Sequence, residues 1–439
     1  MKNEDKMGTK NILPLLVEFS IPAIIGMLVN AIYNIVDRMF IGNAPELGAI
    51  GLAGISICYP VTLVLMAISL MIGMGGATRF SIALGQGKKE EAGKYMGNGL
   101  TLTIILGLVF MILGNVFLAP MLRLLGASKT VLPYAESYLS IILYGAVFQC
   151  IAMAGNNFSR AQGNPKNAMI SQLIGAGFNI LFDYIFMFPL NLGFLGAALA
   201  TALSPVVTML VCSTHYLGKN NHVEFHWRKP SLRRIIRCCQ LGVSAFFAEI
   251  SSAVITIIFN MLILRIAGNI GIAAYGVVAN ISLVAMAILN GFAQGAQPLI
   301  SQSYGKGEHD LVRKFLNWSL AAALLIELVI VVLIYGFTDT FISIFNSEHN
   351  LQLLAYAHTG LRLYFLGFLV AGINIVLVAY FSAIDRARPA VLGSVMRGII
   401  AIAFCAILFS QILGLNGFWL SFLGSEIITF FVILIFRKS

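Results

Sequence analysis

The chain has 439 residues, of which 59% are hydrophobic and only 10% carry a charged side chain. Soluble domains carry roughly 25% charged residues, so this composition excludes a water-soluble fold. Intrinsic disorder is excluded as well, because disordered chains combine low hydrophobicity with high net charge. The remaining class is an integral membrane protein that crosses the bilayer many times.

Apolar runs that are long enough to cross a bilayer follow one another along almost the whole chain. A transmembrane helix needs about 20 mainly apolar residues. Twelve such runs are present, and they cover residues 14–40, 50–79, 95–118, 135–158, 167–189, 194–217, 240–266, 272–299, 315–337, 355–383, 389–412 and 417–436. The runs are continuous, whereas the strands of a membrane β-barrel alternate between apolar and polar residues. We therefore expect an all-α polytopic membrane protein with twelve transmembrane helices.

The net charge of +10 indicates membrane topology rather than a nucleic-acid partner. Lys2, Lys6 and Lys10 precede the first run, and the later lysines and arginines fall mostly in every second loop. Basic loops are retained on the cytoplasmic side of a membrane. We therefore expect both termini to be cytoplasmic, which agrees with an even number of spans, and we expect no binding of nucleic acid.

The second half of the sequence repeats the first. Residues 66–68 and 286–288 both read Met-Ala-Ile, and the pair Gly85 and Gly305 keeps the same offset of 220 residues. Six spans in each half give two lobes that enter the membrane in the same orientation. We therefore expect two parallel six-helix lobes. They are an N-lobe at residues 1–217 and a C-lobe at residues 240–439, joined by a cytoplasmic connector at residues 218–239.

Parallel repeats of this kind are typical of secondary transporters. In such proteins the substrate path lies between the two halves, and rocking of one half against the other gives alternating access. The sequence contains no GxxxxGK[ST] loop, which is the signature of a nucleotide-driven motor. We therefore expect an ion gradient to drive transport, with no cofactor besides the coupling ion H⁺ or Na⁺, and we expect no enzymatic activity.

Five carboxylates fall within the predicted spans, although an ionised group inside a membrane costs at least a few kcal/mol. They are Asp37, Asp183, Glu249, Glu327 and Glu426. Asp37, Asp183 and Thr201 lie at one depth, roughly 8–10 Å below the outer surface at a helical rise of about 1.5 Å per residue. Asn179 lies one helical turn from Asp183 and on the same face.

We interpret Asp37, Asn179, Asp183 and Thr201 as one cation site. Carboxylate, amide and hydroxyl oxygens suit Na⁺, and two neighbouring carboxylates also favour a shared proton. In the alternative interpretation, Asp37 pairs with the adjacent Arg38. We favour the cation site because neighbouring helix positions point about 100° apart, which strains such a pair.

The other polar groups in the spans are harder to interpret. Glu249 lies about nine residues into span seven, and we favour a functional role over an interhelical hydrogen bond. For Glu327 and Glu426 neither interpretation is favoured. Asn34, Asn157 and Gln294 would line a polar cavity or join neighbouring helices by hydrogen bonds, and the sequence does not separate these two roles.

Four motifs carry a resemblance to a known family. They are Phe19-Ser20-Ile21-Pro22, Tyr33-Asn34-Ile35-Val36-Asp37, Arg160-Ala161-Gln162-Gly163-Asn164-Pro165 and Asn179-Ile180-Leu181-Phe182-Asp183. With these motifs the chain resembles, over nearly its whole length, the multidrug and toxic compound extrusion (MATE) transporters, and among them the MepA-like bacterial branch. The resemblance implies two lobes in a V and the export of cationic, amphipathic drugs in antiport with H⁺ or Na⁺.

The resemblance also assigns residues. In family members an Asp, an Asn, an Asp and a Thr form the N-lobe cation site, and they match Asp37, Asn179, Asp183 and Thr201. Pro22 matches a proline that is associated with bending of the first helix. Glu249 matches an acidic residue of span seven in the NorM-like branch. That branch also uses an Asp in span ten, where this chain has Gly372 and Asn374, so Glu249 and Asn374 are the candidates for a C-lobe substrate or proton site.

The resemblance further implies a monomer that contacts lipid in a bacterial plasma membrane. The main alternative is a flippase for lipid-linked sugars or polysaccharides from the same superfamily. Such a flippase would need a cationic cavity for its pyrophosphate, whereas most charges in these spans are acidic. A second alternative, an intramembrane enzyme, is weaker because we find no HExxH motif, no membrane GxGD motif and no paired catalytic Ser and His within the spans.

Overall fold

The computed structural model describes residues 11–42, 48–218, 231–346 and 350–437, and every regular element in these residues is a helix. The first half contains α2 (Ile12–Gly42), α3 (Gly48–Gly85), α4 (Lys89–Val116), α5 (Leu118–Leu124), α6 (Leu132–Ala161), α7 (Pro165–Met187) and α8 (Gly193–Leu217). The second half contains α9 (Leu232–Gly305), α10 (His309–Gly336), α11 (Thr338–Ser343), α12 (Leu351–Phe365), α13 (Phe368–Ala383), α14 (Ala387–Val395), the π-helix η1 (Met396–Ile400) and α15 (Ala401–Arg437).

The helices agree with the predicted twelve spans once their internal breaks are counted. Within the described residues, nine helical segments are long and apolar enough to cross a membrane, and the pair α12 and α13, bent by 45°, makes a tenth. Two of the nine segments each contain two spans. The backbone turns at Gly268 (φ 64°) inside α9 and at Gly414 (φ 59°) inside α15. A positive φ is readily adopted only by glycine, so these residues end one span and begin the next.

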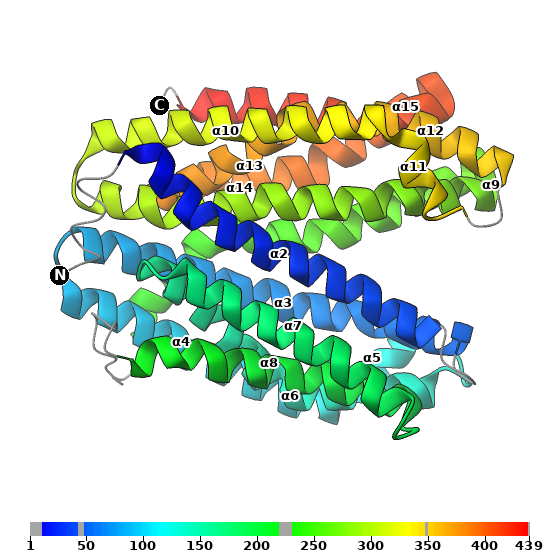
Figure 1. Cartoon of the computed structure of the whole chain (residues 1–439), viewed down its shortest axis with the longest axis horizontal. Coiled ribbons are helices and arrows are strands. Elements are labelled where there is room, and N and C mark those ends of the chain that lie inside the picture. Colours follow the sequence, from blue (N-terminus) through cyan, green and yellow to red (C-terminus); the bar gives the residue numbers. More distant parts are fainter. Residues whose placement is uncertain (1–10, 43–47, 219–230, 347–349, 438–439) are drawn as a thin grey trace.

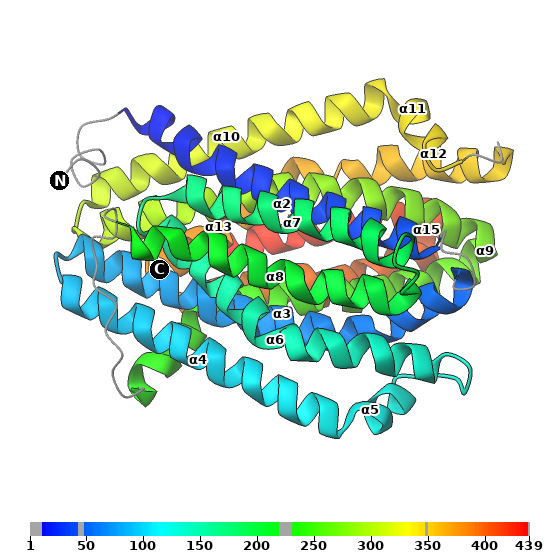
Figure 2. The same cartoon turned by 60° about the horizontal axis from the view of Figure 1, so that its bottom comes forward.

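The helices form two groups that lie side by side, with α2 running diagonally between them (Figure 1). Helices α3 to α8 form the first group and α9 to α15 the second. The beginning of α2 and the end of α15 lie at the same end of the molecule in both views (Figure 2). This arrangement is the all-α, two-lobed architecture that the repeat predicts.

Helix α2 belongs to both groups. Leu15, Leu16 and Phe19 pack into the large hydrophobic core of the second group. Further along, Phe40 contacts the rings of Tyr184 and Phe188 on α7, with centroid distances of 6.5 and 6.3 Å. The first half of α2 is therefore anchored on the C-lobe and its second half on the N-lobe, although the sequence repeat assigns the whole helix to the N-lobe.

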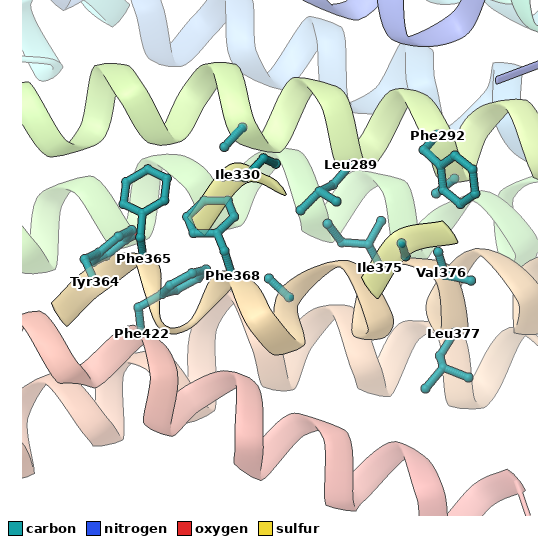
Figure 3. Close-up of a cluster of buried hydrophobic side chains, with 14 of the residues drawn as sticks. Leu289, Phe292, Ile330, Tyr364, Phe365, Phe368, Ile375, Val376, Leu377 and Phe422 are labelled. Atoms are coloured by element: carbon teal, nitrogen blue, oxygen red, sulfur yellow. The ribbon is translucent and has the colours of Figure 1, made fainter. Parts of the chain in front are cut away.

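Stacked aromatic rings dominate the core of the C-lobe (Figure 3). The rings of Tyr364 and Phe422 stack with centroids 4.6 Å apart, and those of Phe365 and Phe368 do so at the same distance. These residues come from α12, α13 and α15, and they surround the bend between α12 and α13. The N-lobe has separate, smaller cores, one of which contains Phe80 and Phe158.

The lobes meet at the end of the molecule that carries the short turns after α3 and α9, which the charge pattern predicts to be cytoplasmic. A methyl group added to Gly85 would lie 3.1 Å from the Cα of Gly305, and one added to Gly305 would lie 3.1 Å from the Cα of Gly85. Arg79 on α3 and Asp385 after α13 add an ion pair of 2.8 Å. Because Gly85 and Gly305 are repeat partners, the two halves touch here at equivalent positions.

The structure describes the two ends of the predicted connector. Its residues 219–230 lie outside the described part of the chain. From Leu232 onward the predicted connector is already helical and forms the beginning of α9. Arg234 on this extension donates two hydrogen bonds to Glu91 of α4. Its Nε donates to Oε1 over 3.1 Å, and its Nη2 donates to Oε2 over 3.2 Å. The hydropathy pattern does not predict this extension because Arg233, Arg234 and Arg237 interrupt its apolar residues.

Candidate functional site

The four residues that depth counting brings together lie on neighbouring helices of the N-lobe. Asn179 and Asp183 are buried on α7, with exposed fractions of 1% and 0%. The amide nitrogen of Asn179 donates to the hydroxyl of Thr201 on α8 over 3.4 Å. Asp37 on α2 is half-buried and interacts electrostatically with Asp183. Three helices therefore contribute oxygen atoms to one small region.

The buried carboxylate of Asp183 lacks a donor. No hydrogen-bond donor among the described residues reaches either of its oxygens, and the side-chain oxygen of Asn179 has none either. Asp37 is close enough for its carboxyl group and that of Asp183 to share a proton. Burying an uncompensated charge is strongly unfavourable. The site is thus incomplete without a positive charge, which a proton or Na⁺ would supply.

Two tyrosines also belong to this region, and the sequence reasoning missed both. Tyr138 on α6 is 5% exposed and lies near Thr201, Asp37 and Asp183. Its ring stacks on Phe194 with a centroid distance of 4.9 Å. Tyr33 on α2 lies near the same two carboxylates. The sequence held a signal for Tyr33, which is one helical turn before Asp37, but none for Tyr138.

The alternative pairing of Asp37 with Arg38 is not decided, because the side chain of Arg38 lies outside the described part of the structure. Pro22 is buried inside α2, which remains one helix across it. It lies within the segment that packs on the C-lobe, which extends to Ile24, and it precedes the segment that carries Asp37. A proline lacks the backbone N–H group and weakens the helix at this place, so the structure locates Pro22 where a bend would move Asp37 relative to the C-lobe.

A small polar cavity of about 20 Å³ lies between α3, α6 and α9, where the two lobes meet. Asn157 and Gln294 both line it, together with Thr78, Gln297 and Arg160. Gln297 donates to Thr78 across the lobes over 2.9 Å, and Arg160 donates to Asn157 over 3.0 Å. A space of this size holds about one water molecule, so the lobes are closed here.

Asn34 does not line this cavity. It is exposed on α2, and its amide nitrogen donates to the backbone oxygen of Asn30 over 2.6 Å. The two residues proposed for the C-lobe differ in their surroundings. Glu249 is half-buried on α9. Asn374 is fully buried and donates to Glu426 over 2.8 Å.

Comparison with known proteins gives a consistent result. The MatE family model matches the chain twice, over residues 22–185 and 245–407. Multidrug export protein MepA of Staphylococcus haemolyticus is 27% identical over 426 residues, which are 96% of this chain and 92% of that protein. The MepA protein of Staphylococcus aureus is 26% identical over 416 residues, which are 94% of this chain and 90% of the relative.

Solved structures agree in fold. An outward-facing multidrug resistance MATE family transporter of the MOP superfamily has a TM-score of 0.92 and 23% identity, over 99% of this chain and 98% of that one. A MATE structure in the bent conformation has a TM-score of 0.89 at the same identity, over 99% and 96%. The two matches of one family model coincide with the two halves of the repeat and together cover most of the sequence, and the chain therefore belongs to the MatE family of membrane transporters.

Proposed function

We propose that this protein is a secondary active multidrug efflux transporter that exports cationic, amphipathic compounds in antiport with H⁺ or Na⁺ by alternating access. The observation that carries the proposal is the buried carboxylate of Asp183, which faces Asp37 and has no donor of its own. Membership of the MatE family and the multidrug export function named for its relatives support the same activity.

The coupling cation would be held by Asp37, Asn179, Asp183 and Thr201. The orphaned oxygens of Asp183 and Asn179 are the acceptors that a cation needs. A bound proton or Na⁺ removes repulsion between Asp37 and Asp183 and lets α2 and α7 approach each other at this depth. Loss of the cation restores the repulsion and drives Asp37 away from α7.

Helix α2 is the element that would transmit this change to the other lobe. A methyl group added to Gly291 or Gly295 of α9 would collide with Ile24 or Ser20, so the first half of α2 packs directly on the C-lobe backbone. The second half carries Asp37. A movement at the cation site therefore acts on an element that both lobes hold, and Pro22 lies within the segment of this element that packs on the C-lobe.

We place the protein in a bacterial plasma membrane, as a monomer in contact with lipid, with both termini cytoplasmic. Two features support this orientation: the beginning of α2 and the end of α15 lie at one end of the molecule, and the turns at that end are basic. We divide the chain into the N-lobe at 1–217, the connector at 218–239 and the C-lobe at 240–439. Helix α2 belongs to the N-lobe in this division, although it packs on both lobes.

The proposal is tested by ethidium accumulation in cells that express Asp183→Asn. We expect this variant to lose efflux at equal protein level, because asparagine keeps the shape of the side chain but has no negative charge to attract Na⁺ and cannot take up a proton. Asp339→Asn is the matched control, since the Asp339 side chain is 78% exposed on α11. Intact efflux in Asp183→Asn would overturn the proposed cation site. Proteoliposomes with separately imposed Na⁺ and pH gradients identify the coupling ion.

One observation favours the flippase alternative. Arg160 is 5% exposed, lines the cavity between the lobes, and has no carboxylate within ion-pair distance among the described residues. A pyrophosphate group would satisfy such a guanidinium. Dithionite quenching of a fluorescent polyprenyl-pyrophosphate sugar in proteoliposomes tests this activity. Movement of that lipid without ethidium transport would establish the flippase instead. Because the MatE family consists of transporters, the intramembrane enzyme is set aside.

A further inference from the structure

A second group of buried charged residues lies in the C-lobe, away from the site of Asp183. It consists of Glu327 on α10, Asn374 on α13, Arg397 on η1 and Glu426 on α15. Glu327, Asn374 and Glu426 are each 0% exposed. Four separate elements place these side chains together, and the sequence pattern favoured no role for either glutamate.

Glu426 is fully partnered. Its Oε1 accepts from the Nε of Arg397 over 2.6 Å, and its Oε2 accepts from the Nδ2 of Asn374 over 2.8 Å. The same Nδ2 donates to the backbone oxygen of Glu426, also over 2.8 Å. The guanidinium of Arg397 thus balances the charge of Glu426, and this glutamate needs no further cation.

Glu327 has no such balance. Its Oε1 accepts from the backbone N–H of Gly372, whereas its Oε2 has no partner among the described residues. The charged groups within electrostatic range of Glu327 are Glu426 and Arg397, and Arg397 is already paired. With both glutamates ionised, the cluster carries one negative charge too many in a buried place, which is strongly unfavourable.

The backbone is shaped to receive the Glu327 carboxyl group. A methyl group added to Gly372 would lie 2.7 Å from Oε1 of Glu327 and 2.9 Å from Leu289. Residue 372 therefore lacks a side chain where the glutamate enters from α10. Arg397 lies in the π-helical turn η1, a type of irregularity that is frequent at functional sites. Both features are independent of the charges themselves.

The missing positive charge is a proton rather than a metal ion. Hard metal cations take about six oxygen ligands. Here the oxygens of Glu426 are occupied by N–H donors, and the unpartnered side-chain oxygens are Oε2 of Glu327 and Oδ1 of Asn374. Two acceptors cannot replace the hydration shell of Na⁺, but one proton is enough to neutralise Glu327.

We propose that Glu327 is a second proton-binding site of this transporter, and that it exchanges its proton as the C-lobe changes conformation. Glu426 and Arg397 form the fixed ion pair beside it, and Gly372 and Asn374 position both glutamates. The proton-binding acid of the C-lobe, Glu327, thus lies on α10, which is the ninth span. Its carboxyl group occupies the space left free by the missing side chain of Gly372 on α13, in the tenth span. The coupling of this exchange to cargo rests on the proposed antiport.

The test is an infrared pH titration of the purified full-length protein, following the C=O band of protonated carboxylic acids. It is carried out in a background with Asp37→Asn, Asp183→Asn and Glu249→Gln, which leaves Glu327 and the paired Glu426 of the five carboxyl groups in the predicted spans. We expect a band that titrates, and we expect Glu327→Gln to abolish it. Glu308→Gln is the matched control, because Glu308 is exposed at the turn between α9 and α10 and its replacement leaves the band in place.

Three outcomes decide the proposal. A titrating band that is lost only with Glu327→Gln supports it, whereas a band that persists in Glu327→Gln, or that never titrates, overturns it. If Glu327→Gln does not fold, Glu327→Asp takes its place, and a shifted midpoint is expected because the shorter acid cannot reach the Gly372 N–H. The infrared band does not depend on transport, so it separates this proposal from the ethidium test of Asp183.

Discussion

Replacement of Gly85 by alanine is expected to open the protein at the end where its lobes meet. The added Cβ would collide with the backbone oxygen of Gln302 on α9 and lie 3.1 Å from the Cα of Gly305. Both obstacles are backbone atoms, so no side-chain rotation relieves the clash. The two helices must move apart, and the conformation with closed inner ends is destabilised relative to the open one.

The size of the effect follows from the cost of overpacking. An extra methyl group in a tightly packed junction costs typically about 1–3 kcal/mol. That free energy raises the population of the open conformation about 5- to 150-fold relative to the closed one. Gly177→Ala on α7 is the matched control, because an added Cβ there meets no atom within 4 Å.

Cys238 reports the opening directly. It is 1% exposed, and its backbone contacts Gly75 at the same junction. In a background where Cys238 is the only cysteine, a membrane-impermeant maleimide is added to inside-out vesicles. We expect Gly85→Ala to speed labelling of Cys238 by the factor given above, and Gly177→Ala to leave the rate unchanged. Equal rates in both variants and the parent would refute the reasoning.

Two further predictions concern polar contacts. The ion pair between Arg79 and Asp385, whose side chains are 14% and 27% exposed, is expected to contribute about 1 kcal/mol, so Arg79→Gln should speed labelling of Cys238 about fivefold. Asparagine tolerates the φ of 64° at residue 385, so adding Asp385→Asn to Arg79→Gln should not raise the labelling rate further. Additive effects on the rate would show that the pair does not join the lobes. Tyr138→Phe keeps the stacking on Phe194 but removes the polar hydroxyl group near Thr201 and the two carboxylates, so the coupling-cation concentration for half-maximal ethidium efflux should rise about fivefold. An unchanged concentration would place Tyr138 outside the cation site.

The sequence alone predicts the features that depend on position along the chain. Hydrophobicity over the bilayer thickness predicts twelve spans, and the structure has them once Gly268 and Gly414 are recognised as turns. The internal repeat predicts two lobes, and the family model matches each half separately. Depth below the surface follows from the helical rise, which is why Asp37 and Asp183 are predicted at one level before any neighbour is known.

Only the tertiary structure decides which side chains meet within a level. Sequence pattern does not give the rotation of a helix about its axis or the order of helices around a lobe, since lipid and protein faces are both apolar. For this reason Tyr138 at the cation site was missed, and the contact of Asn374 with Glu426 was not predicted. Two further features have the same cause: α2 packs on both lobes, and the carboxyl group of Glu327 lies against Gly372. In both cases lateral packing brings together residues whose spacing along the chain carries no signal.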